Sequence, residues 1–393
     1  MPCPTTPPGK AHPRRKKGAN MKNAMLVLCV FLGLSACADR DLMPIVPEAV
    51  EIGTPYTVFS TTTRAQEADG TYGFRRSEQL RMMEMTVTIP PNHSPGELSY
   101  RYKNPDPHKN FAIAEELPVA SVSDLRARFL REQRENNWPL REVTIFVHGY
   151  NSTHPETAYR SAQMAHDVEL PGSLVMYSWP SRGRAFGYAY DIDSMLFARD
   201  GLEETVRRVK QAGAERIILV AHSMGTALAM EMLRQADLRN PGWAARTLNG
   251  GVILISPDLD VDVFESQMMD LKQVPQPFGV MVSEKDHILN ISGRLRGTSE
   301  GERLGNIKSA ERLMKWPIEV IDLTAFNADA ASGHFVAATS PSLLAVIRSA
   351  SNVSRLFGPV DPTLFQQILP QSQTIVTDHG KLMLARQQRQ EER

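Results

Sequence analysis

The sequence predicts an α/β fold built on a doubly wound, mostly parallel sheet of about eight strands. Short runs of β-branched and other apolar residues recur along the chain, and several of those after residue 140 are apolar almost throughout. Such runs are typical of strands that are buried on both faces of a parallel sheet. Helical stretches of about ten to fifteen residues separate them, as in doubly wound folds. The predicted strands are residues 56–60, 85–89, 143–147, 174–177, 217–221, 252–255, 280–282 and 318–321.

The stretches between these strands have helical patterns. In residues 198–212, Leu202, Val206 and Val209 recur at i, i+4 and i+7 and form one apolar stripe. The segment 90–96 is rich in turn residues, so we expect the strands near it to be antiparallel and to lie at the edge of the sheet. The predicted helices are residues 156–167, 198–212, 225–236 and 341–350.

Composition excludes several classes of protein. The 393 residues include 44 basic and 44 acidic side chains, so the formal net charge is zero and a nucleic-acid partner is not expected. The chain contains no cysteine after Cys37, which excludes a disulfide scaffold and a thiolate zinc site. No His/Asp cluster has convincing metal spacing, and no phosphate-binding glycine loop occurs. We therefore expect neither a metal nor a cofactor.

The N-terminal region has the pattern of an export signal. Residues 1–36 hold six basic residues and no acidic one, and they include an apolar run at 24–34. This run is too short to span a bilayer but suits the core of a signal peptide. It ends in Leu34-Ser35-Ala36-Cys37, which resembles the bacterial lipobox, where the peptide is cut before the cysteine and the thiol is acylated. The alternative is an ordinary secretory signal that contains a cysteine, and Met21 is an alternative start codon.

We therefore expect a signal peptide at 1–36 and a lipid anchor, such as palmitate, at Cys37 that holds the chain to a membrane outside the cytoplasm. By resemblance to Gram-negative lipoproteins, Ala38 predicts the bacterial outer membrane, with the protein facing the periplasm. Residues 37–53 comprise the lipidated cysteine and a proline-containing linker. The α/β domain follows at 54–350, and residues 351–393 are predicted to be a partly ordered tail.

The strongest chemical signal is Ser223. A buried strand leads into Ala221-His222-Ser223-Met224-Gly225, and an Ala/Leu/Met-rich helix follows. This strand–turn–helix context is that of a nucleophile elbow, in which small flanking residues permit a tight turn that exposes the serine hydroxyl. The usual motif is G-x-S-x-G, so Ala221 is a mild departure. The alternative is an ordinary helix-capping serine.

A second serine matches the motif letter for letter. It is Ser299, in Gly297-Thr298-Ser299-Glu300-Gly301. No strand precedes it and a charged stretch follows, so nothing would aim the hydroxyl. The sequence therefore favours Ser223 as the nucleophile and predicts a loop around Ser299.

The segment Val147-His148-Gly149-Tyr150-Asn151 follows a buried strand and resembles the oxyanion-hole loop of α/β-hydrolases. Gly149 would let the backbone approach the substrate, and the amide of Tyr150 would donate one hydrogen bond to an oxyanion. The amide of Met224, directly after the nucleophile, would donate the second.

A serine nucleophile needs a base and an acid that orients the base. In folds with a nucleophile elbow, the order along the chain is Ser, then Asp or Glu, then His, and the acid follows a late strand. Asp286 follows the predicted seventh strand and His334 the eighth, so these are the expected acid and base. Asp258 and Asp260 follow the sixth strand and are alternative acids.

Several separated motifs occur in the same order as in one family. Across roughly residues 54–345 the chain resembles the bacterial α/β-hydrolase family of unknown function. This resemblance implies the α/β-hydrolase fold and an esterase- or lipase-like serine hydrolase site, and it implies no particular substrate. The motifs are Thr62-Thr63-Arg64, Val87-Thr88-Ile89-Pro90 with Gly96, Val147–Asn151, Ser178-Trp179-Pro180-Ser181, Ala221–Gly225, and Pro257-Asp258 with Phe264.

Three functions are compatible with these observations. The first is a lipid-anchored hydrolase that cleaves small-molecule or lipid carboxylic esters through an acyl-enzyme. The second is an acyltransferase that uses the same residues to acylate an envelope lipid or glycan. The third is a catalytically silent binding module on the same scaffold, because a fold alone does not guarantee activity.

Overall fold

The computed structural model describes residues 1, 40–289, 292, 303–306, 311–313, 315–328 and 330–349, together with strand backbone at 372–376 and 381–386. The chain divides into two units, Met1–Arg40 and Asp41–Arg393. Of the first unit only Met1 and Arg40 are described, so the predicted signal peptide and Cys37 lie outside the described residues, as does Ser299. The fold below is that of the second unit.

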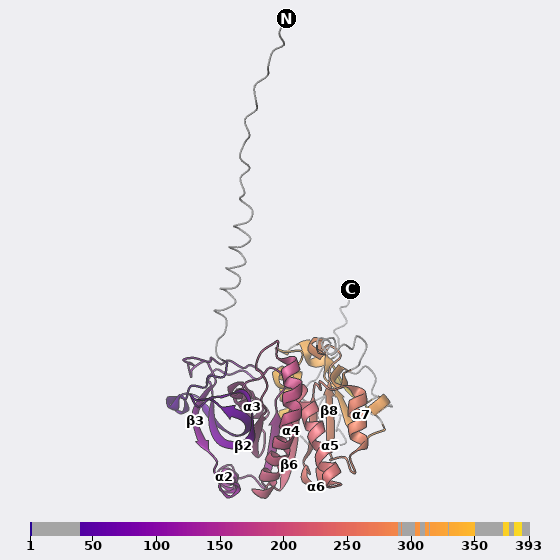
Figure 1. Ribbon diagram of the computed structural model, residues 1–393, viewed down its shortest axis with the longest axis horizontal. Coiled ribbons are helices and arrows are strands. Elements are labelled where there is room, and N and C mark those ends of the chain that lie inside the picture. The colour runs from indigo at the N-terminus through magenta and orange to yellow at the C-terminus, as the bar shows by residue number, and fades with distance from the viewer. Residues whose placement is uncertain are drawn as a thin grey trace. The chain divides into compact units, whose positions relative to one another are not determined.

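Within the described residues, eleven strands form one sheet in the order β10-β11-β9-β8-β7-β6-β4-β5-β1-β2-β3 (Figure 1). From β1 through β5, β4, β6, β7, β8 and β9 to β11, neighbouring strands are parallel; the antiparallel pairs are β1 with β2, β2 with β3, and β10 with β11. The predicted mostly parallel sheet is confirmed. The strands are β1 Thr54–Gln66, β2 Tyr72–Ile89, β3 Ala112–Pro118, β4 Glu142–Val147, β5 Ser173–Ser178, β6 Arg216–His222, β7 Gly251–Ile255, β8 Phe278–Val282, β9 Glu319–Asp322, β10 Ser372–Val376 and β11 Lys381–Arg386.

The prediction of about eight strands was too low. β3 was missed, so the strand before Ser223 is the sixth in the chain rather than the fifth. The two described strands β10 and β11 fall inside the segment 351–393 that the sequence predicts as a partly ordered tail. The expectation of antiparallel edge strands near residues 90–96 agrees with the β1–β2–β3 ladder at that end of the sheet.

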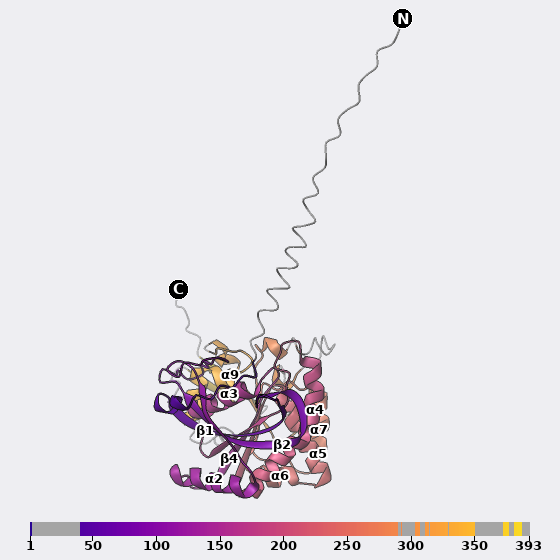
Figure 2. The ribbon, with the colours of Figure 1, turned by 60° about the vertical axis from the view of Figure 1, so that its left-hand side comes forward.

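The helices cover both faces of the sheet. Because successive side chains of a strand point to opposite faces, β4 sends Val143, Ile145 and Val147 to one apolar core and Phe146 to the other. The first core also contains residues of α2, α4, α5 and α7, and the second contains residues of α3, α9 and α10. Figure 2 shows α3 and α9 on one side of the sheet and α4, α5 and α7 on the other. The helices are α2 Val122–Glu135, α3 His154–Asp167, α4 Tyr188–Gln211, α5 Met224–Arg239, α6 Trp243–Thr247, α7 Val261–Met269, α9 Val336–Thr339 and α10 Pro341–Ser349.

The four predicted helices correspond to α3, α4, α5 and α10. α4 begins ten residues before the predicted start at 198, and α2 was not predicted. Four short 3₁₀ turns lie among these elements in the described residues. They are η1 Pro47–Glu51, η2 Leu304–Asn306, η3 Glu311–Leu313 and η4 Thr324–Ala328.

Residues 45–49, within the predicted linker, lie against the edge strand β3. The Val46 N–H donates to the Ile113 carbonyl at 2.8 Å, and Ala49 of η1 is fully buried beside alanines of β3. In the part of the chain that the structure describes, no helix is long and apolar enough to cross a bilayer.

Candidate active site

Ser223 occupies a tight turn between β6 and α5. Its backbone has φ 54° and ψ −125°, which lies outside the regions that L-residues favour. Neighbouring elements fix this conformation: the Ser223 N–H donates to the Ile255 carbonyl at 3.0 Å, and the Ser223 carbonyl accepts from the Thr226 hydroxyl at 2.6 Å. Strained backbone that is held from several sides is typical of functional sites.

Two glycines permit the close approach of the loops. A Cβ at Gly225 would lie 2.4 Å from the His148 carbonyl oxygen, and one at Gly149 would lie 2.8 Å from the Ser223 Cβ. Neither position has room for a side chain, since real Cβ atoms do not come so close. Gly225, one of the small residues that predicted the elbow, is therefore required because the backbone at the end of β4 lies against it.

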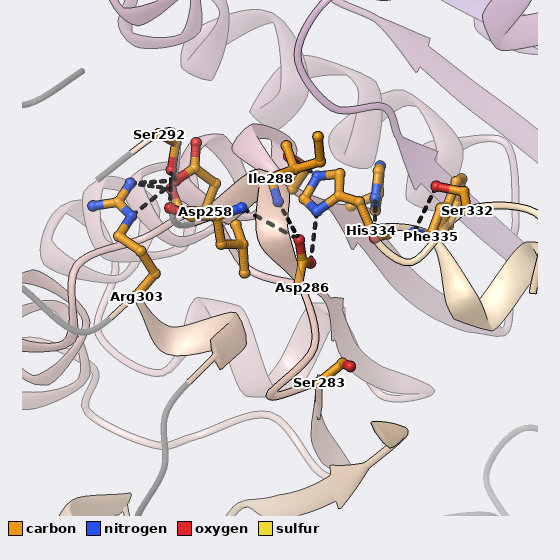
Figure 3. Close-up of polar contacts among 12 residues, drawn as sticks. Asp258, Ser283, Asp286, Ile288, Ser292, Arg303, Ser332, His334 and Phe335 are labelled. Atoms are coloured by element: carbon orange, nitrogen blue, oxygen red, sulfur yellow. Dashed lines mark hydrogen bonds and ion pairs between the residues drawn. The ribbon is translucent and has the colours of Figure 1, made fainter. Parts of the chain in front are cut away.

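The structure brings Ser223, His334 and Asp286 together. The His334 Nε2 lies 2.8 Å from the Ser223 Oγ, and its Nδ1 lies 2.7 Å from an Asp286 oxygen. The other Asp286 oxygen accepts from the backbone N–H groups of Ile288 and Leu289 at 3.1 and 3.3 Å. Asp286 is fully buried, and Figure 3 shows its carboxylate between His334 and the Ile288 backbone. Both oxygens of the carboxylate are thus fixed.

The alternative acids have other partners. Asp258 accepts from the Arg303 Nε at 2.8 Å and from the Ser292 hydroxyl at 2.7 Å (Figure 3). It also accepts from the Tyr188 hydroxyl at 2.9 Å. Asp260 caps α7 and accepts from the N–H groups of its first turn at 2.9 and 3.3 Å. The structure therefore pairs His334 with Asp286, while Asp258 and Asp260 take part in a buried ion pair and a helix cap.

The predicted oxyanion donors flank the serine. Met224 is the first residue of α5, where a backbone N–H has no acceptor within the helix and the helix dipole favours negative charge. Tyr150 follows Gly149, whose Cα lies against the Ser223 side chain. The Tyr150 hydroxyl donates to backbone carbonyls in the loop before α4, at 3.2 Å for Arg184 and in a shorter bond for Ala185. This fixes the oxyanion loop at its outer edge.

Arg64 of β1 fixes the same loop from the inside. Its fully buried guanidinium donates to the carbonyls of Ser152 at 2.8 Å, of Ser181 at 3.1 Å and of Gly73 at 3.1 Å, and to the Ser178 hydroxyl at 2.9 Å. Burial lowers the pKa of Arg64 to about 10, so the group remains charged at neutral pH. From the sequence, Arg64 is only one residue of the motif Thr62-Thr63-Arg64, and no role was predicted for it.

Two further histidines lie near the site. His148 stacks on Trp179 with ring centroids 5.0 Å apart, and burial, followed by the charge of Arg64, lowers its pKa to about 3. His222 stacks on Phe335 at 3.8 Å, and burial, followed by the charge of His334, lowers its pKa well below the usual value. Both rings therefore stay uncharged at neutral pH. Besides stacking, they contact backbone carbonyls: the His148 nitrogens lie 2.8 Å from the Gly149 oxygen and 3.1 Å from the Trp179 oxygen, and the His222 Nε2 lies 3.3 Å from the His334 oxygen.

No group of three or more His, Cys, Asp or Glu side chains among the described residues is placed to hold a metal ion. The arrangement that remains is a serine hydroxyl next to an imidazole, which a carboxylate orients, beside two backbone amides. This arrangement can form and stabilise a tetrahedral oxyanion on an acyl group.

Comparison with solved structures finds α/β hydrolases at low identity. A predicted CIB-like hydrolase from Thermoplasma acidophilum is 17% identical and covers 51% of this chain and 80% of its own, with a TM-score of 0.30. An esterase from Rhizomucor miehei is 12% identical over 82% and 87%, with a TM-score of 0.33, and a bacterial heroin esterase is 13% identical over 84% and 92%, with a TM-score of 0.30. At these values the structures say nothing about the substrate of this chain.

A search of curated proteins finds no match. A family described as alpha/beta hydrolase of unknown function (DUF900) matches residues 127–350, more than half of the chain. This range contains Ser223, Asp286 and His334 as well as β4 to β9. The chain therefore belongs to this family of α/β hydrolases.

Proposed function

We propose that this protein is a serine hydrolase that cleaves carboxylic esters through an acyl-enzyme. The hydrogen-bonded series Ser223–His334–Asp286, at a strained strand–helix turn, is the observation that supports the proposal. Membership of an α/β-hydrolase family agrees with it.

In this mechanism the His334 Nε2 takes the proton of the Ser223 hydroxyl as the oxygen attacks the ester carbonyl. Asp286 holds the imidazole in the required orientation and stabilises its charged form. The amides of Tyr150 and Met224 donate to the oxyanion, and removing one such donor typically lowers kcat about 10²–10³-fold. His334 then protonates the leaving alcohol, and water releases the acyl group by the same steps in reverse.

An acyl chain would find apolar surface on the loop before α4. On this loop Phe186 is fully exposed. Tyr188 is buried, and Tyr190 donates to the Phe74 carbonyl at 2.7 Å. Because the Tyr150 hydroxyl bonds the neighbouring Ala185 carbonyl, we assign this apolar contact to Phe186.

Labelling with a fluorophosphonate probe tests the proposal, since the probe reacts only with an activated serine. We expect the wild type and Ser299→Ala to be labelled and Ser223→Ala to lose the label. Loss in Ser299→Ala instead would contradict the choice of serine. A folded wild type that takes no label would favour the binding module, and transfer of the acyl group to an added alcohol rather than to water would favour the acyltransferase.

We also propose that a lipid at Cys37 anchors the enzyme to the bacterial outer membrane, a proposal that rests on the sequence Leu34-Ser35-Ala36-Cys37 and on Ala38. Metabolic labelling with palmitate should mark the wild type and not Cys37→Ser, and the label should fractionate with outer-membrane vesicles. Secretion of an unlabelled wild type would favour the ordinary signal peptide.

A further inference from the structure

His334 lies in a connection with little regular structure. Between the end of β9 at Asp322 and the start of α9 at Val336, the described residues contain only the 3₁₀ turn η4. α9 itself has four residues, and so short a helix is not stable without contacts to the rest of the fold. The position of His334 therefore depends on what holds this segment in place.

Thr339, the last residue of α9, joins the helix to the backbone around His334. Its hydroxyl donates to the Phe335 carbonyl at 2.8 Å and accepts from the Ser332 N–H at 3.2 Å. The Ser332 hydroxyl accepts in turn from the Phe335 N–H at 3.3 Å (Figure 3). Residues 332–339 therefore form one unit, and a displacement of α9 would displace His334.

Gln163 of α3 is hydrogen-bonded to the same unit. Its side chain is fully buried, and its Nε2 donates to the Ala338 carbonyl at 3.1 Å and to an Asp167 oxygen. Its Oε1 accepts from an Arg160 N–H at 2.6 Å. The last carbonyls of a helix have no donor within the helix, so Gln163 supplies one that α9 cannot. Since the guanidinium only donates and the carbonyl and carboxylate only accept, a single orientation of the amide satisfies all three partners.

Asp167, one turn after Gln163, is fixed on both of its oxygens. The His93 Nε2 lies 2.6 Å from one oxygen, and the Gly96 N–H donates at 2.8 Å to the other, which also accepts from Gln163. The side chains of Asp167 and His93 are 1% and 7% exposed. Burial would raise the pKa of Asp167, but the hydrogen bonds from these partners outweigh it and hold the pKa below its ordinary value. The carboxylate is therefore ionised at neutral pH and is a fixed acceptor for Gln163.

Gly96 lies against α9 at the same place. Its φ is 87°, which favours glycine, and a Cβ there would lie 2.8 Å from the Thr339 carbonyl oxygen. A side chain at position 96 would therefore displace α9. From the sequence, Gly96 is only one residue of a motif. This contact explains why a glycine stands where the segment 90–96, α3 and α9 meet.

We propose that Gln163 and Asp167 are positioning residues of the active site. Through the Ala338 carbonyl they hold α9, and with it His334, where the His334 Nε2 reaches the Ser223 hydroxyl. This inference rests on the proposed hydrolase function, in which His334 takes the serine proton. A misplacement of a reacting group by about 1 Å can lower the rate about 10²-fold. Loss of the contact with α9 should therefore lower kcat and leave KM unaltered.

Gln163→Met tests the proposal, because it keeps the length of the side chain and removes its donor. With a p-nitrophenyl ester, at a temperature at which the variant is folded, kcat should fall about 10- to 100-fold and KM should change less than about twofold. The matched control is Gln267→Met in α7. Gln267 is also buried and donates to a carboxylate, that of Glu231, at 3.2 Å. This control should leave kcat unaltered.

Asp167 supplies a conservative pair of variants. Asp167→Ala removes the acceptor of Gln163 and should lower kcat as Gln163→Met does. Asp167→Asn keeps the oxygen that accepts from Gly96 and Gln163, and its amide can donate to the His93 Nε2 in one tautomer of the ring. This variant should retain kcat within about fivefold of the wild type. Equal losses in both variants would contradict a role that depends on these hydrogen bonds.

Hydrogen exchange of the backbone amides of residues 331–339, measured by mass spectrometry, reports on α9 whether or not the protein is a hydrolase. Exchange should be at least about tenfold faster in Gln163→Met and Asp167→Ala than in the wild type, and unaltered in Gln267→Met. Unaltered exchange in the first two variants, or faster exchange with unaltered kcat, would overturn the proposal. A wild type without Ser223-dependent hydrolysis would contradict the proposed function, and the exchange rates would still decide whether the two residues hold α9.

Discussion

The loops after β7 and β8 each carry a buried aspartate, and the two side chains have different partners. Asp258, after β7, is paired with Arg303 and with two hydroxyls, so its charge is neutralised within the fold. Asp286, after β8, accepts two backbone N–H groups and faces His334. Both follow neighbouring parallel strands at the same edge of the sheet. A position at this edge is therefore not sufficient for an aspartate to serve as the proposed acid. Its hydrogen-bond and ion-pair partners determine whether it is available to the histidine.

Replacing each aspartate by asparagine distinguishes the proposed catalytic acid from the ion-pair partner. The largest effect expected is the loss of activity in Asp286→Asn. Asp286→Asn should lower kcat about 10⁴-fold, because an amide no longer holds the imidazole in the required tautomer. Asp258→Asn should lower kcat less than about tenfold, since its partners lie outside the Ser223–His334 series. Hydrolysis of a p-nitrophenyl ester measures both. The opposite order of the two effects would make Asp258 the acid.

The effects of the two replacements on stability should have the opposite order to their effects on activity. Asp258→Asn leaves the Arg303 side chain, which is 3% exposed, without its counter-ion, and breaking a buried pair in this way costs about 3–5 kcal/mol. The double variant Asp258→Asn/Arg303→Met removes both charges and should recover most of this loss. Urea denaturation gives the free energies of unfolding. A double variant no more stable than Asp258→Asn would show that the charge is not the cause.

Glu132 of α2 provides a third buried carboxylate, whose hydrogen-bond partner is the Ser173 hydroxyl rather than a cation or a histidine. Burial raises its pKa from 4.5 to about 7, so the folded state holds this proton more tightly than the unfolded chain does. Its contribution to stability is complete below about pH 4.5 and is lost as the pH rises through about 7, by at most about 3 kcal/mol. Glu132→Gln should therefore flatten the pH dependence of unfolding between pH 5 and 8. An unaltered pH profile would contradict this assignment.

The smallest effect is expected for His222, the neighbour of His334. Its ring centroid lies 4.9 Å from that of His334, but its pKa is held well below the usual value by burial and by the charge of His334. His222→Phe keeps the stacking on Phe335 and should lower kcat less than tenfold. The acid limb of the pH–rate profile should not move, since His334 alone is proposed to take up the proton. A displaced limb would mean that both rings titrate together.

The central strands could be predicted because runs such as residues 217–221 are apolar throughout when both faces are buried. The edge strand β3 could not, since Glu115 and Glu116 interrupt its apolar residues where one face is exposed. The helix α2 was missed for a similar reason: only Leu125 and Phe129 of its apolar residues are buried in an otherwise charged segment.

The Ser, Asp and His positions followed from where strands end, which the sequence reveals. The roles of Arg64 and Arg303 could not be predicted in this way. Arg64 donates mainly to backbone carbonyls, among them Ser152 and Ser181, which lie 88 and 117 positions away. Any residue supplies a carbonyl, so such contacts have no signature in the sequence. A buried arginine can be located only when the loops around it are known.

The backbone at Ser223 has a consequence for evolution and for engineering. A residue at φ 54° and ψ −125° costs about 1–3 kcal/mol unless it is glycine. Every sequence that retains the serine therefore carries this cost, and selection for heat resistance alone would favour Ser223→Gly. A serine at this position therefore lowers stability in return for the proposed role of its hydroxyl.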